Sequence, residues 1–262
     1  MKHSKGQWRH MLGRLSVVLM LGAATIAGSI TATAAPTQAT PAKPIRVVTE
    51  HWPGYTSATG TGAYFEMLYL VLKPDPAPKV QLMPFARAVV ATERQQADLV
   101  FAVTARDSQL LLRSNLPMDW DRIVAVYKKD ARIDQAVRAN QLQQLRLSWR
   151  LGYNYGSVVG VTTPGYETLS AEQGVQLALN QRVDVFLSEE DELNTPQIQQ
   201  WLSKGATVQP VAIVPIYVGF APTERGRELK QQWDHSFIQA QHTPEMQDFY
   251  RRYPGMRVPA AE

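Results

Sequence analysis

Short apolar strands alternate with helical patterns from residue 45 onward, and this alternation constrains the fold more than any other feature of the sequence. Residues 98–103 (DLVFAV) form a continuous apolar run, which is typical of a strand buried in a parallel sheet. Residues 63–72 (AYFEMLYLVL) are apolar nearly all round, which predicts a buried helix that ends at the following PDPAP run. Strands that alternate with helices in this way predict an α/β fold with mostly parallel sheets.

The remaining segments fall into two groups on either side of a polar stretch at residues 128–145, where the pattern indicates a polar helix, a linker and a domain boundary. The predicted strands are residues 45–50, 80–83, 98–103, 123–127, 147–151, 183–187, 206–211 and 216–221, and the predicted helices are residues 63–72, 85–96, 171–180, 190–202, 225–241 and 244–253.

Residues 1–34 have the features of a secretory signal peptide. Four basic residues precede an apolar run at 15–30, and Ala32-Thr33-Ala34 offers an A-x-A cleavage site. The run is about sixteen residues long and contains glycine and serine, so a membrane anchor, which needs ~20 apolar residues, is the less favoured alternative. Export without an anchor predicts a periplasmic protein, and no cysteine is present to carry a lipid.

The charge and the missing cysteine exclude several classes of function. Without residues 1–34 the 27 Lys and Arg residues fall to 23, which equals the number of Asp and Glu residues, so the mature chain lacks the basic surplus of nucleic-acid-binding proteins. A chain without cysteine forms no disulfide, thiol nucleophile or cysteine-ligated metal site. The sequence contains no G-x-S-x-G, HExxH or P-loop motif, and we expect no catalytic activity, cofactor or metal.

The loop after the first predicted strand gathers groups that can hold a small molecule. Glu50 ends the strand, Trp52 and Tyr55 follow it, and Tyr64 lies at the start of the next helix. In open α/β sheets, ligands bind in the crevice outside the carboxyl ends of the strands. We therefore take these four residues as candidate ligand-binding residues, with packing as the alternative for the aromatic rings.

A second loop, GYNYGS at residues 152–157, also follows a predicted strand. Tyr153 and Tyr155 offer apolar rings with polar tips, which suit stacking on a ligand. Gly156 belongs to a turn before a predicted helix start, where exposed N–H groups favour an anionic part of a ligand. A plain turn is the alternative interpretation of the glycine.

The order of these segments resembles the periplasmic solute-binding proteins of the type II, polar-amino-acid ABC-transporter family (family 3) and their uncharacterised relatives. The resemblance covers essentially the whole mature chain and depends on VVTEHWPGY, PFARAVVATERQQADLVFAV, LGYNYG and VDVFLSEE, in that order. It implies a two-lobed periplasmic-binding-protein type II fold, with lobe one formed by residues 36–124 plus 215–262 and lobe two by residues 125–214. A two-crossing hinge near Tyr127 and Val214 joins the lobes and closes them on a ligand.

The resemblance also implies roles for two charged residues. In amino-acid binders of this family an arginine after the third strand takes the ligand carboxylate, and Arg106 matches that position; a bidentate guanidinium suits a carboxylate. An acid after a lobe-two strand takes the ligand ammonium, and Glu189 stands there where Asp is usual. Arg87 is a further candidate near a predicted helix start. The alternatives are a solvated or salt-bridged role for the arginines and helix capping for Glu189.

These observations predict a monomeric binding protein that closes on a small polar solute, an amino acid or a related compound, and passes it to a membrane permease. The alternative is a ligand-sensing periplasmic module that signals to a membrane receptor without transport. A carboxylate-dependent cell-wall enzyme, with Glu50 and Glu189 as an acid/base pair across the cleft, is the least favoured interpretation.

Overall fold

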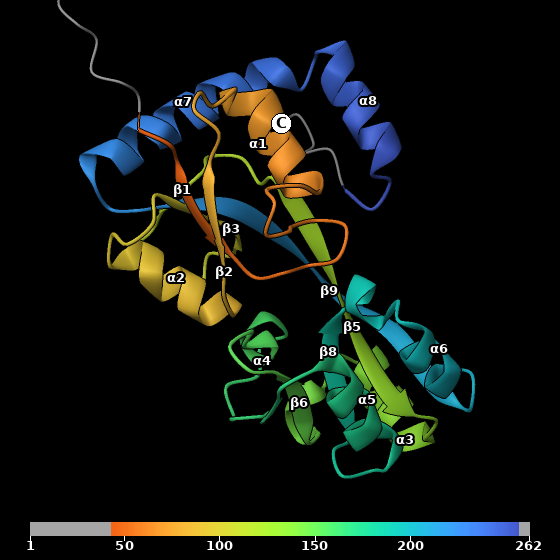
Figure 1. Cartoon of the computed structure of the whole chain (residues 1–262). Helices are drawn as coiled ribbons and strands as arrows, with labels where there is room; N and C mark the ends of the chain where they lie inside the picture. Colours follow the sequence, from red (N-terminus) through yellow and green to blue (C-terminus); the bar gives the residue numbers. More distant parts are fainter. Residues whose placement is uncertain (1–42, 257–262) are drawn as a thin grey trace, which may run out of the picture. The chain divides into compact units, whose positions relative to one another are not determined.

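The computed structural model describes residues 43–256, which form a nine-stranded sheet with helices packed against it (Figure 1). The predicted signal peptide and its cleavage site lie outside the described residues. Within residues 43–256, no helix is both long enough and apolar enough to cross a membrane.

The strands follow the order β2-β1-β3-β9-β5-β8-β6-β7, and β4 pairs with β9 beside this path. The strands are β1 (Arg46–Thr49), β2 (Lys79–Leu82), β3 (Leu99–Val103), β4 (Leu112–Arg113), β5 (Asp119–Lys128), β6 (Leu147–Arg150), β7 (Tyr166–Thr168), β8 (Val185–Glu189) and β9 (Ala206–Phe220). The helices are α1 (Ala63–Leu72), α2 (Phe85–Glu93), α3 (Ala131–Arg138), η1 (Leu142–Gln144), α4 (Tyr155–Val158), α5 (Ala171–Leu179), η2 (Glu190–Leu193), α6 (Pro196–Leu202), α7 (Glu224–Ala240) and α8 (Pro244–Arg252).

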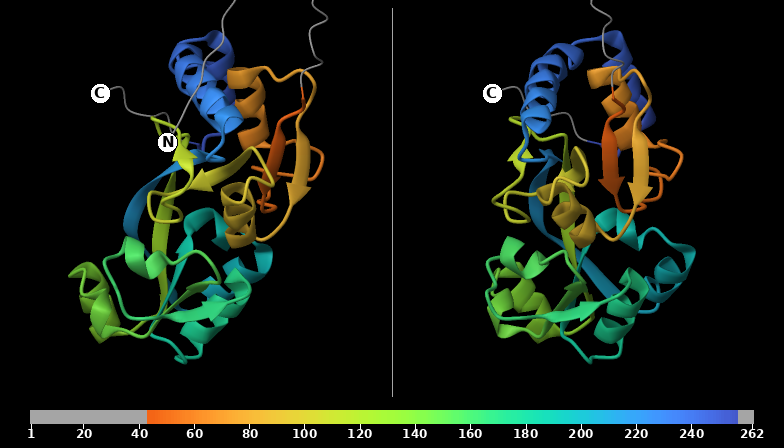
Figure 2. Two further views of the ribbon diagram at one scale, coloured as in Figure 1. Left: turned by 90° about the vertical axis from the view of Figure 1, so that its left-hand side faces the viewer. Right: turned by 60° about the vertical axis from the view of Figure 1, so that its left-hand side comes forward.

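The sheet has two halves that share its two long central strands. In the first half β1 runs parallel to β2 and β3, and in the second half β6 runs parallel to β7 and β8. The central strands β5 and β9 pair antiparallel with each other and with the halves beside them, and they run from one half to the other (Figure 2). Helix α1 packs against α7 and α8 over the first half, whereas α5 packs against β5 and β8 in the second.

Strand β9 joins two segments that the sequence pattern separates. We predicted separate strands at residues 206–211 and 216–221, and this break was wrong, because one strand runs through Pro210 and Pro215. Pairing of β9 with β3 starts only at Tyr217, so the residues before it have a neighbour on one side only, the β5 side. A proline is tolerated on such an edge or at a bulge, and Pro210 lies opposite the irregularity between Ile123 and Val124.

The predicted helix at 190–202 was also wrong, because the structure has two shorter helices, η2 and α6, in its place. Thr195 accepts a hydrogen bond from the backbone N–H of Ile198, and Pro196 follows it at the first helical position. Proline favours a helix start and cannot continue a preceding helix, so α6 begins anew at this point. The polar stretch after residue 128 contains α3, which Asp130 caps through the backbone N–H groups of Arg132 and Ile133.

Each half of the sheet has its own apolar core. In the first half the helix predicted at residues 63–72 is confirmed, and Phe65 and Leu68 on α1 are fully buried with Trp233 on α7. In the second half Tyr127 and Leu187 are fully buried. A second, smaller apolar cluster lies in each half, around Val48 and Val100 in the first and around Val124 and Phe186 in the second.

Candidate functional site

A cavity of about 880 Å³ lies between the two halves of the sheet. Residues after β1, at the end of β6 and at the end of β8 line it, as expected for the carboxyl edge of parallel strands. The start of β5 reaches the same edge, because β5 runs antiparallel to β8 and places Ile123 opposite Glu189. The charged and ionisable residues of the lining are Glu50, His51, Tyr55, Tyr64, Asp107, Asp119, Asp121, Arg122, Arg150, Tyr153, Tyr155, Glu172, Glu189, Glu190, Asp191 and Glu192.

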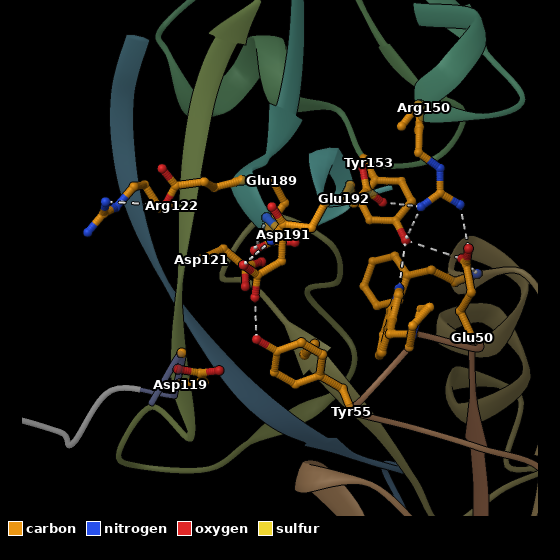
Figure 3. A pocket seen from close by; sticks show the side chains of 18 of the residues that line it. Glu50, Tyr55, Asp119, Asp121, Arg122, Arg150, Tyr153, Glu189, Asp191 and Glu192 are labelled. Atoms are coloured by element: carbon orange, nitrogen blue, oxygen red, sulfur yellow. Dashed lines mark hydrogen bonds and ion pairs between the residues drawn. The ribbon is translucent and has the colours of Figure 1, made fainter. Parts of the chain in front are cut away.

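Arg150 links the two halves on one side of the cavity (Figure 3). Its guanidinium bonds to Glu50, which follows β1, and to Glu192 of η2. The three side chains are only 18%, 18% and 14% exposed, so these are largely desolvated ion pairs. The two carboxylates raise the pKa of Arg150 against the opposing effect of its burial.

Tyr153 completes this network, which we call the Arg150 network: Arg150, Glu50, Glu192, Tyr153 and Trp52. The Tyr153 hydroxyl accepts hydrogen bonds from Trp52 Nε1 (3.0 Å) and from Arg150 (3.0 Å), and it donates to Glu50 (3.2 Å). The guanidinium carbon of Arg150 lies 4.6 Å from the centre of the Tyr153 ring. Burial raises the pKa of the Tyr153 hydroxyl, which therefore stays protonated and able to donate.

The loop between β1 and α1 holds its side chains in fixed positions. Glu50 accepts a hydrogen bond from the backbone N–H of Phe85 (2.8 Å), at the N-terminus of α2. The Thr56 hydroxyl donates to the Glu50 carbonyl (2.6 Å) and accepts from the Trp52 backbone N–H (2.9 Å). Gly62 has a φ of 109°, and a Cβ there would lie 2.5 Å from the Tyr55 carbonyl, so the return of the loop to α1 requires glycine.

Acidic side chains gather on the other side of the cavity, around Asp121 and Asp191 (Figure 3). Tyr55 donates a hydrogen bond to Asp191, and the Glu189 carboxylate accepts one from the Asp191 backbone N–H (3.3 Å). Burial, followed by the charges of Asp121 and Asp191, raises the pKa of Glu189 to about 9. Burial and the neighbouring Asp119 likewise raise the pKa of Asp121 well above its usual range. The cavity therefore gathers acidic groups that solvent does not reach freely and that ionise less readily than exposed carboxyl groups.

Two tyrosines of the lining keep a free hydroxyl. The side chains of Tyr64 and Tyr155 are both 5% exposed, and both line the cavity. Within residues 43–256 neither hydroxyl has a hydrogen-bond partner, although both rings pack on other aromatic rings. Burial raises the pKa of both phenols, so each is a neutral donor and acceptor beside the cavity.

The structure brings most of the predicted site residues together. Three candidates do not line the large cavity: Arg87 is exposed on α2, Arg106 is exposed and lines a separate cavity of about 20 Å³, and Gly156 is buried. A Cβ on Gly156 would lie 2.6 Å from the Trp149 ring, so packing alone accounts for that glycine. The candidates that line the large cavity are Glu50, Trp52, Tyr55, Tyr64, Tyr153, Tyr155 and Glu189.

Sequence reasoning missed Arg150, Asp121 and Asp191. Arg150 ends β6 just before the GYNYGS loop, so the rule that selected Glu50 at the end of β1 would also have selected it. Asp121 stands near the beginning of a strand and becomes a cavity residue only because β5 runs antiparallel to β8. Within residues 43–256, no group of three or more His, Asp or Glu side chains is arranged to hold a metal ion.

No protein-family model matches the chain, and no curated protein sequence matches it. Solved structures do resemble it. An ABC uptake transporter substrate-binding protein from Streptococcus pneumoniae with bound histidine has a TM-score of 0.58 and 13% identity over 83% of this chain and 95% of its own. An arginine transport system periplasmic binding protein from Legionella pneumophila has a TM-score of 0.61 and 14% identity over 81% and 100%.

A histidine kinase sensor domain with similarity to periplasmic binding proteins has a TM-score of 0.65 and 12% identity over 84% of this chain and 99% of its own. At such low identity these similarities concern the fold. They confirm the predicted fold class, an α/β fold of the periplasmic-binding-protein type.

Proposed function

We propose that this protein is an extracytoplasmic solute-binding protein that closes on a small polar solute and delivers it to a membrane permease. One observation carries the proposal: the large cavity lies between the two halves of the sheet, and side chains from both halves meet across it in the Arg150 network. A cavity of about 880 Å³ has the size of a small-molecule site. The solved structures of similar fold, two of them transport binding proteins, support the same interpretation.

The predicted lobes remain part of this proposal: residues 36–124 plus 215–262 as lobe one, and residues 125–214 as lobe two. The strands β5 and β9 are the two crossings between them. Closure about these strands would bring Trp52 to Tyr153 and Glu50 to Arg150, which lie close together in this structure. Export to the periplasm, with the predicted signal peptide removed, is the proposed location.

Binding can be tested by thermal shift and calorimetry with amino acids, amines, small carboxylates and sugars. A solute at 100 times its dissociation constant stabilises the protein by about 2.7 kcal/mol, which is seen as a higher melting temperature. Tyr153→Phe keeps the ring and removes the hydroxyl that joins the Arg150 network, so we expect weaker binding of the same solute. The matched control is Tyr166→Phe, because Tyr166 is 65% exposed on β7 and lies outside the cavity. If no compound shifts the melting temperature of ligand-free protein, the proposal fails.

A sensory role is the second candidate, and the fold shared with a histidine kinase sensor domain is the observation that favours it. Uptake of the labelled solute by cells separates the two functions. Deletion of the gene abolishes uptake if the protein serves a permease. Uptake continues unchanged if the protein reports the solute to a membrane receptor.

The acid/base pair of an enzyme finds less support in the geometry. Glu50 is bonded to Arg150, Tyr153 and the Phe85 backbone N–H, so its carboxylate is occupied by donors. Glu189 lies on the acidic side of the cavity with Asp121 and Asp191. The two residues thus serve in separate groups of side chains.

A further inference from the structure

The charge of the cavity restricts the chemistry of its occupant, if the cavity binds a solute as proposed above. Nine carboxylates and two arginines line it, and no lysine does, so the lining carries a net negative charge even after each arginine is paired. Burial, and after it the charges of Asp121 and Asp191, raise the pKa of Glu189, so the neighbouring acids add to the cost of its ionisation. An occupant that brings positive charge would relieve this repulsion.

The two arginines of the lining are both held by carboxylates. Arg150 lies between Glu50 and Glu192, and Arg122 lies 3.2 Å from Glu190. Arg106, the residue expected to take a ligand carboxylate, does not line the large cavity. A solute carboxylate would therefore have to displace an existing ion pair and would face the acids of the opposite side, and like charges placed together cost several kcal/mol.

The two phenols provide a second observation, separate from the charges of the lining, that suits a cationic ligand. Tyr64 and Tyr155 line the cavity with hydroxyls that have no hydrogen-bond partner within residues 43–256. Their oxygens reach the cavity, and a phenol oxygen can accept a hydrogen bond from an ammonium or guanidinium group. The electron-rich faces of such rings also attract cations.

We infer that the solute is a small organic cation, an amine or a guanidine that carries no carboxylate. Glu189 releases its proton to solvent when the cation enters, so that Asp121 and Glu189 supply the negative charge that its N–H groups contact. The hydroxyls of Tyr64 and Tyr155 accept the remaining hydrogen bonds. The site is the cavity itself, with its aromatic and acidic walls, and it prefers the decarboxylated form of a basic amino acid to the amino acid.

Matched pairs of compounds test this preference directly. Calorimetry at pH 7 compares agmatine with arginine, putrescine with ornithine and cadaverine with lysine, each pair differing by one carboxylate. We expect at least one amine to bind at least tenfold more tightly than its parent amino acid. A neutral analogue of putrescine, 1,4-butanediol, should not bind.

Variants locate the site. We expect Asp121→Asn and Glu189→Gln each to weaken binding of the amine about tenfold or more, because hydrogen bonds to charged groups are lost. Glu228→Gln is the matched control, since Glu228 is exposed on α7 and outside the cavity lining, and it should bind like the natural protein. Circular dichroism and thermal unfolding establish that each variant is folded.

The outcomes separate this inference from the proposed function. If an amino acid or a carboxylate binds as tightly as every amine tested, or if Asp121→Asn and Glu189→Gln bind the amine normally, the inference is overturned and the binding function stands. If no solute of any class binds, both fail.

Discussion

Replacing Arg150 with methionine should reduce the free energy of unfolding by about 3 kcal/mol at pH 7. The guanidinium bonds Glu50 and Glu192 and contacts Tyr153, and its side chain is 18% exposed. Removing one partner of a buried ion pair costs about 3–5 kcal/mol because the other charge is left unpaired, and the residual exposure here favours the lower value. Methionine keeps most of the side-chain volume, so the decrease in the free energy of unfolding measures the effect of removing the charge.

Urea unfolding followed by circular dichroism measures the change. The loss should become smaller at pH 4.5, because protonation of Glu192 removes one of the unpaired charges. Burial already raises the pKa of Glu192, which makes that protonation easier. Adding Glu192→Gln to Arg150→Met should recover part of the stability.

Arg87→Met is the matched control, because Arg87 is exposed on α2, and its effect should stay within about 0.5 kcal/mol. A loss below about 1 kcal/mol for Arg150→Met, or an equal loss at both pH values, would refute the view that Arg150 is held as a desolvated ion pair.

Three further changes probe the same region. The folded-state pKa of Glu189, about 9, lies above its usual value, so the folded protein holds a proton that the unfolded chain loses. The free energy of unfolding should therefore fall as pH rises from about 4.5 to about 9, by up to about 1.4 kcal/mol per pH unit. In urea unfolding between pH 6 and 9, Glu189→Gln should make this fall smaller. Trp52→Phe removes the hydrogen-bond donor to Tyr153. It should weaken solute binding in calorimetry and lower the free energy of unfolding by only about 1 kcal/mol. If the free energy of unfolding falls by more than the free energy of binding, Trp52 serves the core and not the site. Gly156→Ala places a Cβ 2.6 Å from the Trp149 ring and should lower the free energy of unfolding by about 1–3 kcal/mol, and an unchanged melting temperature would show that the helix shifts freely.

Local patterns predicted the elements that depend on local causes. The apolar run at 63–72 ends at a proline-rich stretch, and α1 has the same limits. The errors came from prolines whose effect depends on the neighbouring strand or helix. Pro215 ends no strand because β3 pairs with β9 only beyond it, whereas Pro196 does end the preceding helix because Thr195 caps a new one.

The site was predictable where a side chain follows the carboxyl end of a parallel strand, as Glu50 and Glu189 do. The place of Asp121 in the cavity was not predictable from the sequence. Asp121 lies before the apolar residues of β5, and it reaches the cavity only because β5 runs antiparallel to β8, which the sequence pattern does not reveal. Arg106 was placed by family resemblance alone, and the structure puts it outside the large cavity. Charge pairing across the cavity, as between Arg150 and Glu50, depends on tertiary structure and has no local signature.

The paired strands β5 and β9 have a mechanical consequence. Their ladder runs from Asp119 opposite Ile216 to Lys128 opposite Ala206, with one irregularity between Ile123 and Val124. Small changes of twist spread over so many paired residues need not break a hydrogen bond of the ladder. For the proposed opening and closing of the two lobes, we therefore expect the opening rate to depend on breaking the bonds across the cavity between Arg150 and Glu50 and between Tyr153 and Trp52.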